Sequence, residues 1–160
     1  MSKGKNSRPL QENEYMALAE FRYQLRRFLR HMEEEVRQVG LNPQQYQLLL
    51  AIKGLPRHQV PTISCLADRM QLNHNSMVEL VDRCEDRSLL RRTRSDDDRR
   101  QVTLSLTSEG DTMLRRLGTA ARRELSSIGP SLVESVLRLI RTPRVARKPR
   151  AAAAAGASKK

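Results

Sequence analysis

Polar side chains that can bind nucleic acid bases stand together at the start of one predicted helix, as Asn73, His74, Asn75 and Ser76. The Asn amide can form two hydrogen bonds to adenine, and Ser or His can bind bases or phosphates. Asn73 or Asn75 can also cap the helix, which explains one of these residues but not the whole group. Side chains in this position of a recognition helix reach base edges in the major groove, so the group predicts DNA contacts.

A second group of charges, residues 95–100, lies between two predicted strands. In residues 101–106, apolar and polar side chains alternate, as in a strand with one buried face. Because both arms are too short for an isolated hairpin, the ribbon must lean on the helices. Mixed charges in a turn are usually solvated and salt-bridged, but the paired strands favour a DNA-binding ribbon. Its positive side chains are Arg91, Arg92, Arg94, Arg99 and Arg100.

The elements between residues 62 and 107 have the order of a winged helix-turn-helix. Thr62 is a predicted N-cap for a short helix that extends to about Arg69, and residues 70–72 form the turn. The next helix continues with Met77, Leu80, Val81 and Cys84 at spacings of three and four, which is typical of a buried helical face. The fold class predicted is mainly α with a small β-hairpin wing.

A long helix is predicted over residues 12–39, where Leu18, Leu25, Met32 and Val39 repeat every seven residues. Further apolar residues widen this stripe beyond one seam. Such a helix can meet both its own domain and a second chain, which favours a homodimer. The alternative is a single buried helix in a monomer.

Helix boundaries on either side of the central motif follow from caps and breakers. Asn42 as N-cap and Pro43 in the first turn predict a helix over residues 43–53. Thr107 and Ser108 predict the start of a fifth helix that extends to about residue 127. Gly129-Pro130 is expected to break it, so that residues 131–140 form a short sixth helix.

The net charge of +12 resides mainly in the ends of the 160-residue chain. Residues 1–9 carry three basic and residues 141–160 seven basic side chains, with no acidic ones, whereas the stretch between them is nearly balanced. Residues 1–11 are expected to be a flexible arm and the Ala-rich residues 141–160 a disordered tail. The tail could strengthen DNA binding by neutralising phosphates or could be passive.

Several other classes of function find little support in the sequence. No apolar run approaches the roughly 18 residues that a membrane span requires, and the start of the chain lacks the apolar stretch of a secretory signal. Two cysteines, Cys65 and Cys84, give no disulfide framework, which favours a cytoplasmic protein. The scattered histidines and the absence of a CxxC pattern or a Gly-rich phosphate loop argue against an enzyme, a metal site or a cofactor.

At this point residues 12–140 resemble the MarR-type transcriptional regulators. The resemblance lies in the order of six helices with a ribbon after the fourth, and in three segments of sequence. These are LNPQQYQLLLAI, ISCLADRMQLNHNSMVELVDR and DDDRRQVTLSLTSEG. Its most specific part is Asp98-x-Arg100 followed by VTLSLT. One departure is Ser88, where many members have Gly; if the backbone is left-handed there, Ser costs about 1 kcal/mol.

The resemblance implies a dimer in which residues 12–40 and 108–140 supply the dimerisation helices and residues 41–107 form the DNA-binding lobe. Arg100 would enter the minor groove, and Asp98 would hold that Arg or its loop in place. Positions 73–77 match the family's base and phosphate contacts. The predicted DNA-binding residues are Asn73, His74, Asn75, Ser76, Met77, Arg94, Asp98, Arg99 and Arg100.

The function expected is sequence-specific regulation of transcription, as a repressor on a palindromic DNA site, with an architectural DNA binder of little sequence preference as the alternative. The resemblance also implies a possible small aromatic or phenolic effector, bound between the dimer and DNA lobes. Its site cannot be assigned from sequence, although Arg26, Arg30, His31 and Tyr46 lie near the expected junction. Some members of the family sense oxidants, but buried structural cysteine is the preferred interpretation of Cys65 and Cys84.

Overall fold

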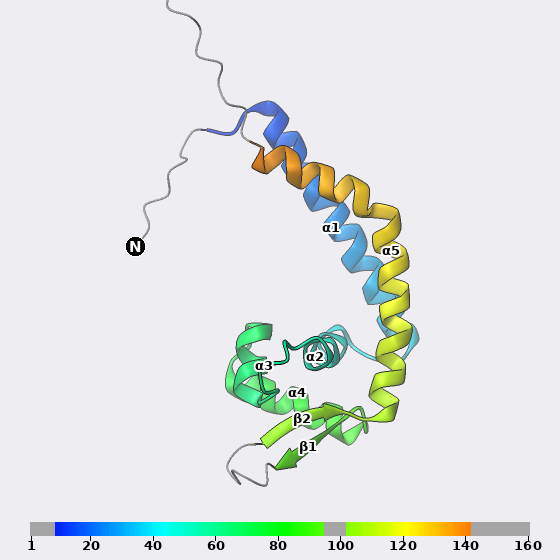
Figure 1. Cartoon of the computed structure of the whole chain (residues 1–160). Coiled ribbons are helices and arrows are strands. Elements are labelled where there is room, and N and C mark those ends of the chain that lie inside the picture. Colours follow the sequence, from blue (N-terminus) through cyan, green and yellow to red (C-terminus); the bar gives the residue numbers. More distant parts are fainter. Residues whose placement is uncertain (1–8, 95–101, 142–160) are drawn as a thin grey trace, which may run out of the picture.

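Two long helices and a compact lobe make up the protein (Figure 1). The computed structural model describes residues 9–94 and 102–141. Helices α1 and α5 lie side by side and extend away from the lobe that the other elements form. The elements are α1 (Glu12–Gln38), α2 (Pro43–Lys53), α3 (Ile63–Met70), α4 (His74–Asp86), β1 (Leu90–Arg94), β2 (Val102–Leu106) and α5 (Ser108–Ile140). The predicted fold class, mainly helical with a two-stranded hairpin, is confirmed.

Four helices begin at side-chain caps that the sequence predicted. Asn42 accepts a hydrogen bond from the backbone N–H of Gln45, and Thr62 accepts one from Cys65. The two remaining pairs are Asn73 with the N–H of Ser76, at 2.8 Å, and Thr107 with the N–H of Gly110, at 3.1 Å. Each cap satisfies a donor that the helix itself leaves unpaired, which explains why these chain positions start helices.

The predicted break at Gly129-Pro130 is wrong, because α5 continues through Pro130 to Ile140. The chain therefore has five helices in its described residues and not six. Proline removes one helical hydrogen bond and crowds the preceding turn. Residues on both sides of it, Ile128 and Ser135, are nevertheless buried, and α1 packs along α5. This packing outweighs the local cost, and α5 bends along its length (Figure 1).

The core of the lobe is aliphatic. Leucines from α2, α3, α4 and both strands meet there with Met77 and Cys84. Helix α1 contributes only its C-terminal half, through Met32 and Val36. Its predicted heptad positions differ in burial, because Met32 is buried whereas Leu18 is 38% exposed. The outer half of α1 thus retains much apolar surface.

The hairpin leans on the lobe, as its short arms required. Strands β1 and β2 are antiparallel, with Leu90 opposite Leu106 and Arg94 opposite Val102. On its other edge, β2 is hydrogen-bonded to the segment that precedes α3. The N–H of Leu104 donates to the carbonyl oxygen of Pro61 at 2.9 Å. The predicted alternation of buried and exposed residues is confirmed only at Leu104, which is buried. The other four residues of β2 are all partly exposed, whichever face of the strand they lie on.

Ser88 does adopt the left-handed backbone that the comparison with Gly suggested, with a φ of 54°. It lies between α4 and β1, where its carbonyl oxygen accepts a hydrogen bond of 2.6 Å from the hydroxyl of Thr107. That bond ties the entry of the hairpin to the start of α5. The predicted tip, residues 95–100, lies outside the described residues, as do residues 1–8 of the predicted arm (1–11) and residues 142–160 of the predicted tail (141–160).

Gly110 is required by a close approach that the sequence did not indicate. A Cβ atom at this position would stand 2.0 Å from the backbone carbonyl oxygen of Leu89. Real atoms do not approach so closely, so a side chain here would force the first turn of α5 away from the hairpin.

We therefore expect Gly110→Ala to lower the free energy of unfolding by roughly 1–3 kcal/mol or more, measured by urea denaturation. The matched control is Gly118→Ala in the same helix, where a Cβ would meet nothing within 4 Å. That variant should be neutral or more stable by up to about 1 kcal/mol, because alanine favours helix over glycine. Equal effects of the two substitutions would contradict the packing described for Gly110.

Candidate nucleic-acid interface

Helix α4 has one buried and one exposed side. Its buried residues are Met77, Leu80, Val81 and Cys84, none more than 1% exposed. The exposed side begins with His74 and Asn75. The prediction of Met77 as a DNA-contacting residue is therefore corrected. Its side chain is 0% exposed and belongs to the lobe core, since it continues the apolar series of the helix.

The remaining polar residues at the start of α4 have different roles. The amide oxygen of Asn73 is occupied by the N–H of Ser76, so this residue caps the helix. Asn75 and His74 are exposed, and among the described residues neither side chain has a hydrogen-bonding partner. Ser76 is partly exposed. Asn75 and His74 are therefore the side chains of this group that are best placed to bind an external molecule.

The hairpin offers a second set of exposed groups. Arg94, at the end of β1, is exposed, and no described residue pairs with its guanidinium. Arg91 is also exposed, and its Nε donates to the hydroxyl of Ser105 across the hairpin at 3.2 Å. The predicted tip contacts Asp98, Arg99 and Arg100 lie outside the described part of the chain. The cationic wing is thus described at its base and not at its tip.

Arg92 differs from the neighbouring arginines because it faces back toward α4. Its guanidinium pairs with Asp82 at 2.5 Å and also with Glu85. Glu85 additionally accepts a hydrogen bond from the backbone N–H of Arg92 at 3.1 Å. Burial alone would lower the pKa of Arg92, but the hydrogen bonds to Asp82 and Glu85 raise the pKa overall. This network was missed by sequence reasoning, which counted Arg92 with the free positive charges.

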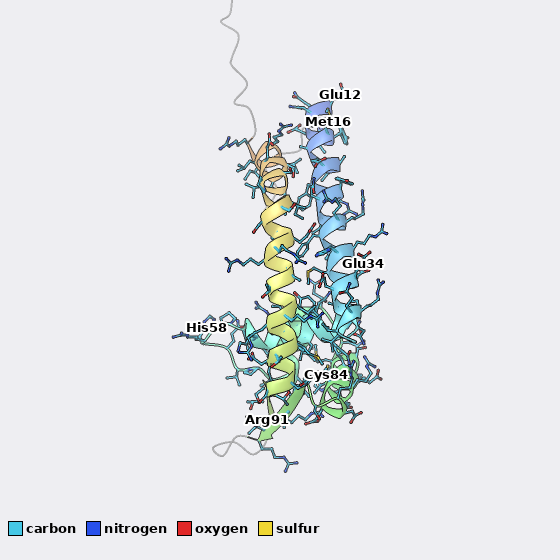
Figure 2. All side chains as sticks on the ribbon, turned by 90° about the vertical axis from the view of Figure 1, so that its right-hand side faces the viewer. Glu12, Met16, Glu34, His58, Cys84 and Arg91 are labelled. Carbon is cyan, nitrogen blue, oxygen red and sulfur yellow. The ribbon has the colours of Figure 1, made fainter. Side chains whose placement is uncertain are left out.

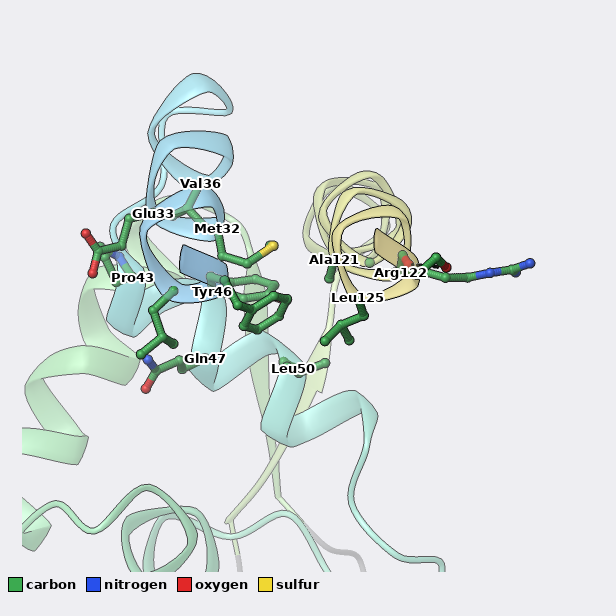
Figure 3. A pocket seen from close by; sticks show the side chains of 14 residues that line it. Met32, Glu33, Val36, Pro43, Tyr46, Gln47, Leu50, Ala121, Arg122 and Leu125 are labelled. Atoms are coloured by element: carbon green, nitrogen blue, oxygen red, sulfur yellow. Dashed lines mark hydrogen bonds between the residues drawn. The ribbon is translucent and has the colours of Figure 1, made fainter. Parts of the chain in front are cut away.

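A cleft lies where α1, α2 and α5 meet, at the junction of the long helices and the lobe (Figure 3). Its volume is about 690 Å³, and its walls are mainly apolar, with Met32, Tyr46 and Leu125 facing one another across it. Of the junction residues suggested by sequence, Tyr46 lines the cleft, whereas Arg26, Arg30 and His31 do not. Partial burial raises the pKa of the Tyr46 phenol. The phenol O–H can donate a hydrogen bond.

The cysteines and histidines do not form a reactive centre within residues 9–94 and 102–141. Cys84 is buried in the lobe, and this burial raises the pKa of its thiol to about 11 (Figure 2). A thiol of such high pKa is a poor nucleophile, which supports a structural role. Cys65 is partly exposed, and its Sγ lies 3.9 Å from the side-chain oxygen of Gln59. No cluster of three metal-ligating side chains occurs in this part of the chain.

None of the described helices has the length and apolar character that a membrane crossing requires.

Residues 39–101, which include α2 to α4 and strand β1, match the MarR family. One relative is the HTH-type transcriptional repressor MdtR of Bacillus subtilis. It is 35% identical over 80 residues, and the match spans half of this chain and half of that protein.

Two solved structures extend the similarity to the long helices. The transcriptional repressor CouR, bound to a 23-mer DNA duplex, is 27% identical with a TM-score of 0.59. The match covers 81% of this chain and 94% of CouR. A MarR family protein from Bacillus stearothermophilus gives a TM-score of 0.66 at 20% identity, over 81% of this chain and 94% of that one. With its capped helix-turn-helix, hairpin and paired long helices, the chain is similar to the MarR family of winged helix-turn-helix regulators.

Proposed function

We propose that the protein is a transcriptional repressor that binds a palindromic DNA site as a homodimer in the cytoplasm. The observation that carries this proposal is the arrangement of α4, which buries its apolar side and presents Asn75 and His74 at its exposed N-terminal end. A recognition helix reads bases with side chains in this position. The exposed Arg94 at the base of the hairpin supplies a cation for the neighbouring backbone.

The relatives support the same function. CouR is a repressor whose structure contains a DNA duplex, and the similarity to it covers the lobe and both long helices. MdtR also bears the name of a repressor. Regulators of this family are not enzymes, which agrees with the lack of a catalytic pattern in the sequence. The wing tip, with Asp98, Arg99 and Arg100, is proposed to extend the DNA contact toward the minor groove.

The long helices carry the surface proposed for dimerisation. Large apolar side chains remain exposed at their outer ends; on α1, Tyr15 and Met16 are 58% and 66% exposed, and Met16 lies near its free end (Figure 2). On α5, Val133 and Ile140 are 56% and 67% exposed. An apolar surface of this kind is unfavourable in water and is typical of an interface between subunits. A twofold dimer would present two copies of α4 to two half-sites, which predicts a palindromic site.

The cleft is the proposed binding site of a small effector. Its volume and its apolar walls suit a compact lipophilic molecule, and Tyr46 can donate a hydrogen bond to it. The cleft lies between α2, which belongs to the lobe, and the long helices. A molecule bound there would bias the orientation of the lobe and hence its fit to DNA, which is how an effector would release the repressor.

The alternative function is that of an architectural DNA binder without sequence preference. The charge of residues 141–160, seven basic and no acidic side chains, favours it. Phosphate contacts alone give strong but unselective binding that depends steeply on salt. The two functions therefore differ in whether the protein distinguishes one DNA sequence from another.

Selection of bound sequences from a random DNA pool, with the full chain at physiological salt, tests the proposal. We expect enrichment of one palindrome, bound by two chains per duplex in sedimentation equilibrium. The selected duplex should bind at least about 10³-fold more tightly than a random duplex, as specific regulators do. An unenriched pool with equal affinities would support the architectural alternative and contradict the repressor.

Asn75→Ala and removal of residues 141–160 should affect binding in different ways. Loss of the Asn75 amide should weaken binding to the selected duplex by roughly 1–3 kcal/mol and leave random DNA unchanged. Loss of the tail should weaken both and flatten the dependence of affinity on salt. The matched control is Asn13→Ala, an exposed amide at the outer end of α1. A truncation that changed the preferred sequence would contradict this division.

The effector site is tested by filling the cleft. Ala121→Phe places a ring in the cleft, and Thr119→Phe places one on an exposed position of the same helix that does not line it. With 2-naphthol and benzoate as probes, we expect a probe that occupies the cleft to lower DNA affinity by about 5–150-fold in the wild type and in Thr119→Phe. Ala121→Phe should bind DNA and not respond. An equal response of all three proteins would place the effector elsewhere.

A further inference from the structure

The contact between Arg92 and α4 has a geometry that a solvated charge on a hairpin would not show. The side chain of Arg92 is 27% exposed, and it bridges Asp82 and Glu85 on the last turns of the helix. Glu85 holds the strand twice, through the guanidinium and through the backbone N–H of Arg92. Because Asp82 and Glu85 are three residues apart, they lie on the same face of α4 and can share one planar guanidinium.

We propose that Arg92 is a positioning residue, which fixes the hairpin against the recognition helix so that both meet DNA in one orientation. The inference rests on the proposed DNA-binding function and deepens it. Arg92 lies in the middle of β1, two residues before the exposed Arg94, and its partners lie on the helix that begins with His74 and Asn75. Each bond to Arg92 thus limits how far the wing can turn relative to α4.

The charges of this network assign different roles to the arginines of β1. Two carboxylates face one guanidinium, so Arg92 is neutralised where it stands and has little charge left for a phosphate. Arg94 has no such partner among the described residues and is free to bind the DNA backbone. Arg92 also neutralises one of two acidic side chains close to the DNA-facing lobe, where an unpaired carboxylate would repel phosphate.

Arg92→Lys separates geometry from charge. Lysine retains the positive charge, but it cannot bridge two carboxylates as the rigid, planar guanidinium does. Affinity is to be measured over a range of salt concentrations, for the duplex selected from the random pool and for a random duplex of equal length. We expect the affinity of Arg92→Lys for the selected duplex to fall on the order of tenfold, while that for the random duplex changes little.

The dependence of affinity on salt distinguishes a residue that binds phosphate from one that positions the hairpin. Only the loss of a phosphate contact should change it. Arg94→Ala, the matched control, should reduce the slope of log affinity against log salt by about one, because a phosphate contact is lost. Arg92→Lys should leave this slope unchanged. Glu85→Gln should also impair selectivity, and its effect should not add to that of Arg92→Lys, because the two residues act through the same contact.

Unchanged affinity of Arg92→Lys for the selected duplex would overturn the proposal, and so would a reduced salt slope like that of Arg94→Ala. Should Arg92→Lys fail to fold, Asp82→Asn decides by the same two readouts, since it leaves the bond between Arg92 and Glu85 in place. It should lose selectivity and retain the slope. If the wild type itself shows no preference for any duplex, the proposed function fails, and that result is distinct from a failure of the positioning role.

Discussion

The burial of one side of α4 is the constraint on which the arrangement of the lobe depends. Met77, Leu80, Val81 and Cys84 are almost completely removed from water and contact the other helices and the hairpin through a common core. A helix held in this way cannot rotate about its axis without exposing that apolar surface, which costs roughly 25 cal/mol per Å². The orientation of Asn75 and His74 toward the outside is therefore a consequence of packing in the core.

Two close backbone contacts hold the hairpin at the end of this helix. The left-handed Ser88 turns the chain into β1, and its carbonyl oxygen accepts a hydrogen bond from Thr107. Immediately afterwards, Gly110 lets the first turn of α5 lie against the carbonyl of Leu89. The start of α5 is thereby tied to the hairpin, so the long helices and the lobe are joined at this point. The contact of Lys53 on α2 with Asp111 on α5, at 2.7 Å, reinforces that connection.

Local rules predicted much of this structure from the sequence. The four side-chain caps and the apolar spacing of α4 depend on neighbours within a few positions. The unbroken α5 could not be predicted in this way, because packing against α1 offsets the local penalty of Pro130. The need for glycine at position 110 arises from Leu89, twenty-one residues earlier in the chain but adjacent in space.

The candidate site was predicted less completely than the fold. Met77 fitted two patterns in the sequence, the group of predicted DNA contacts at the start of α4 and the apolar series of the same helix. Its burial shows that it belongs to the apolar series. Arg92 resembled its neighbours in a run of arginines, and only the position of Asp82 and Glu85 on the preceding helix distinguishes it. Net charge was a poor guide, since most of it lies in the terminal segments.

We propose that two copies of α4 and its hairpin read one DNA site together. Hydroxyl-radical footprinting of the full chain on a duplex selected from random DNA tests it most directly. The account predicts two symmetric protected segments, centred about 10 base pairs or a multiple of one helical turn apart. Uniform protection along the duplex, or a single protected segment without twofold symmetry, would contradict it.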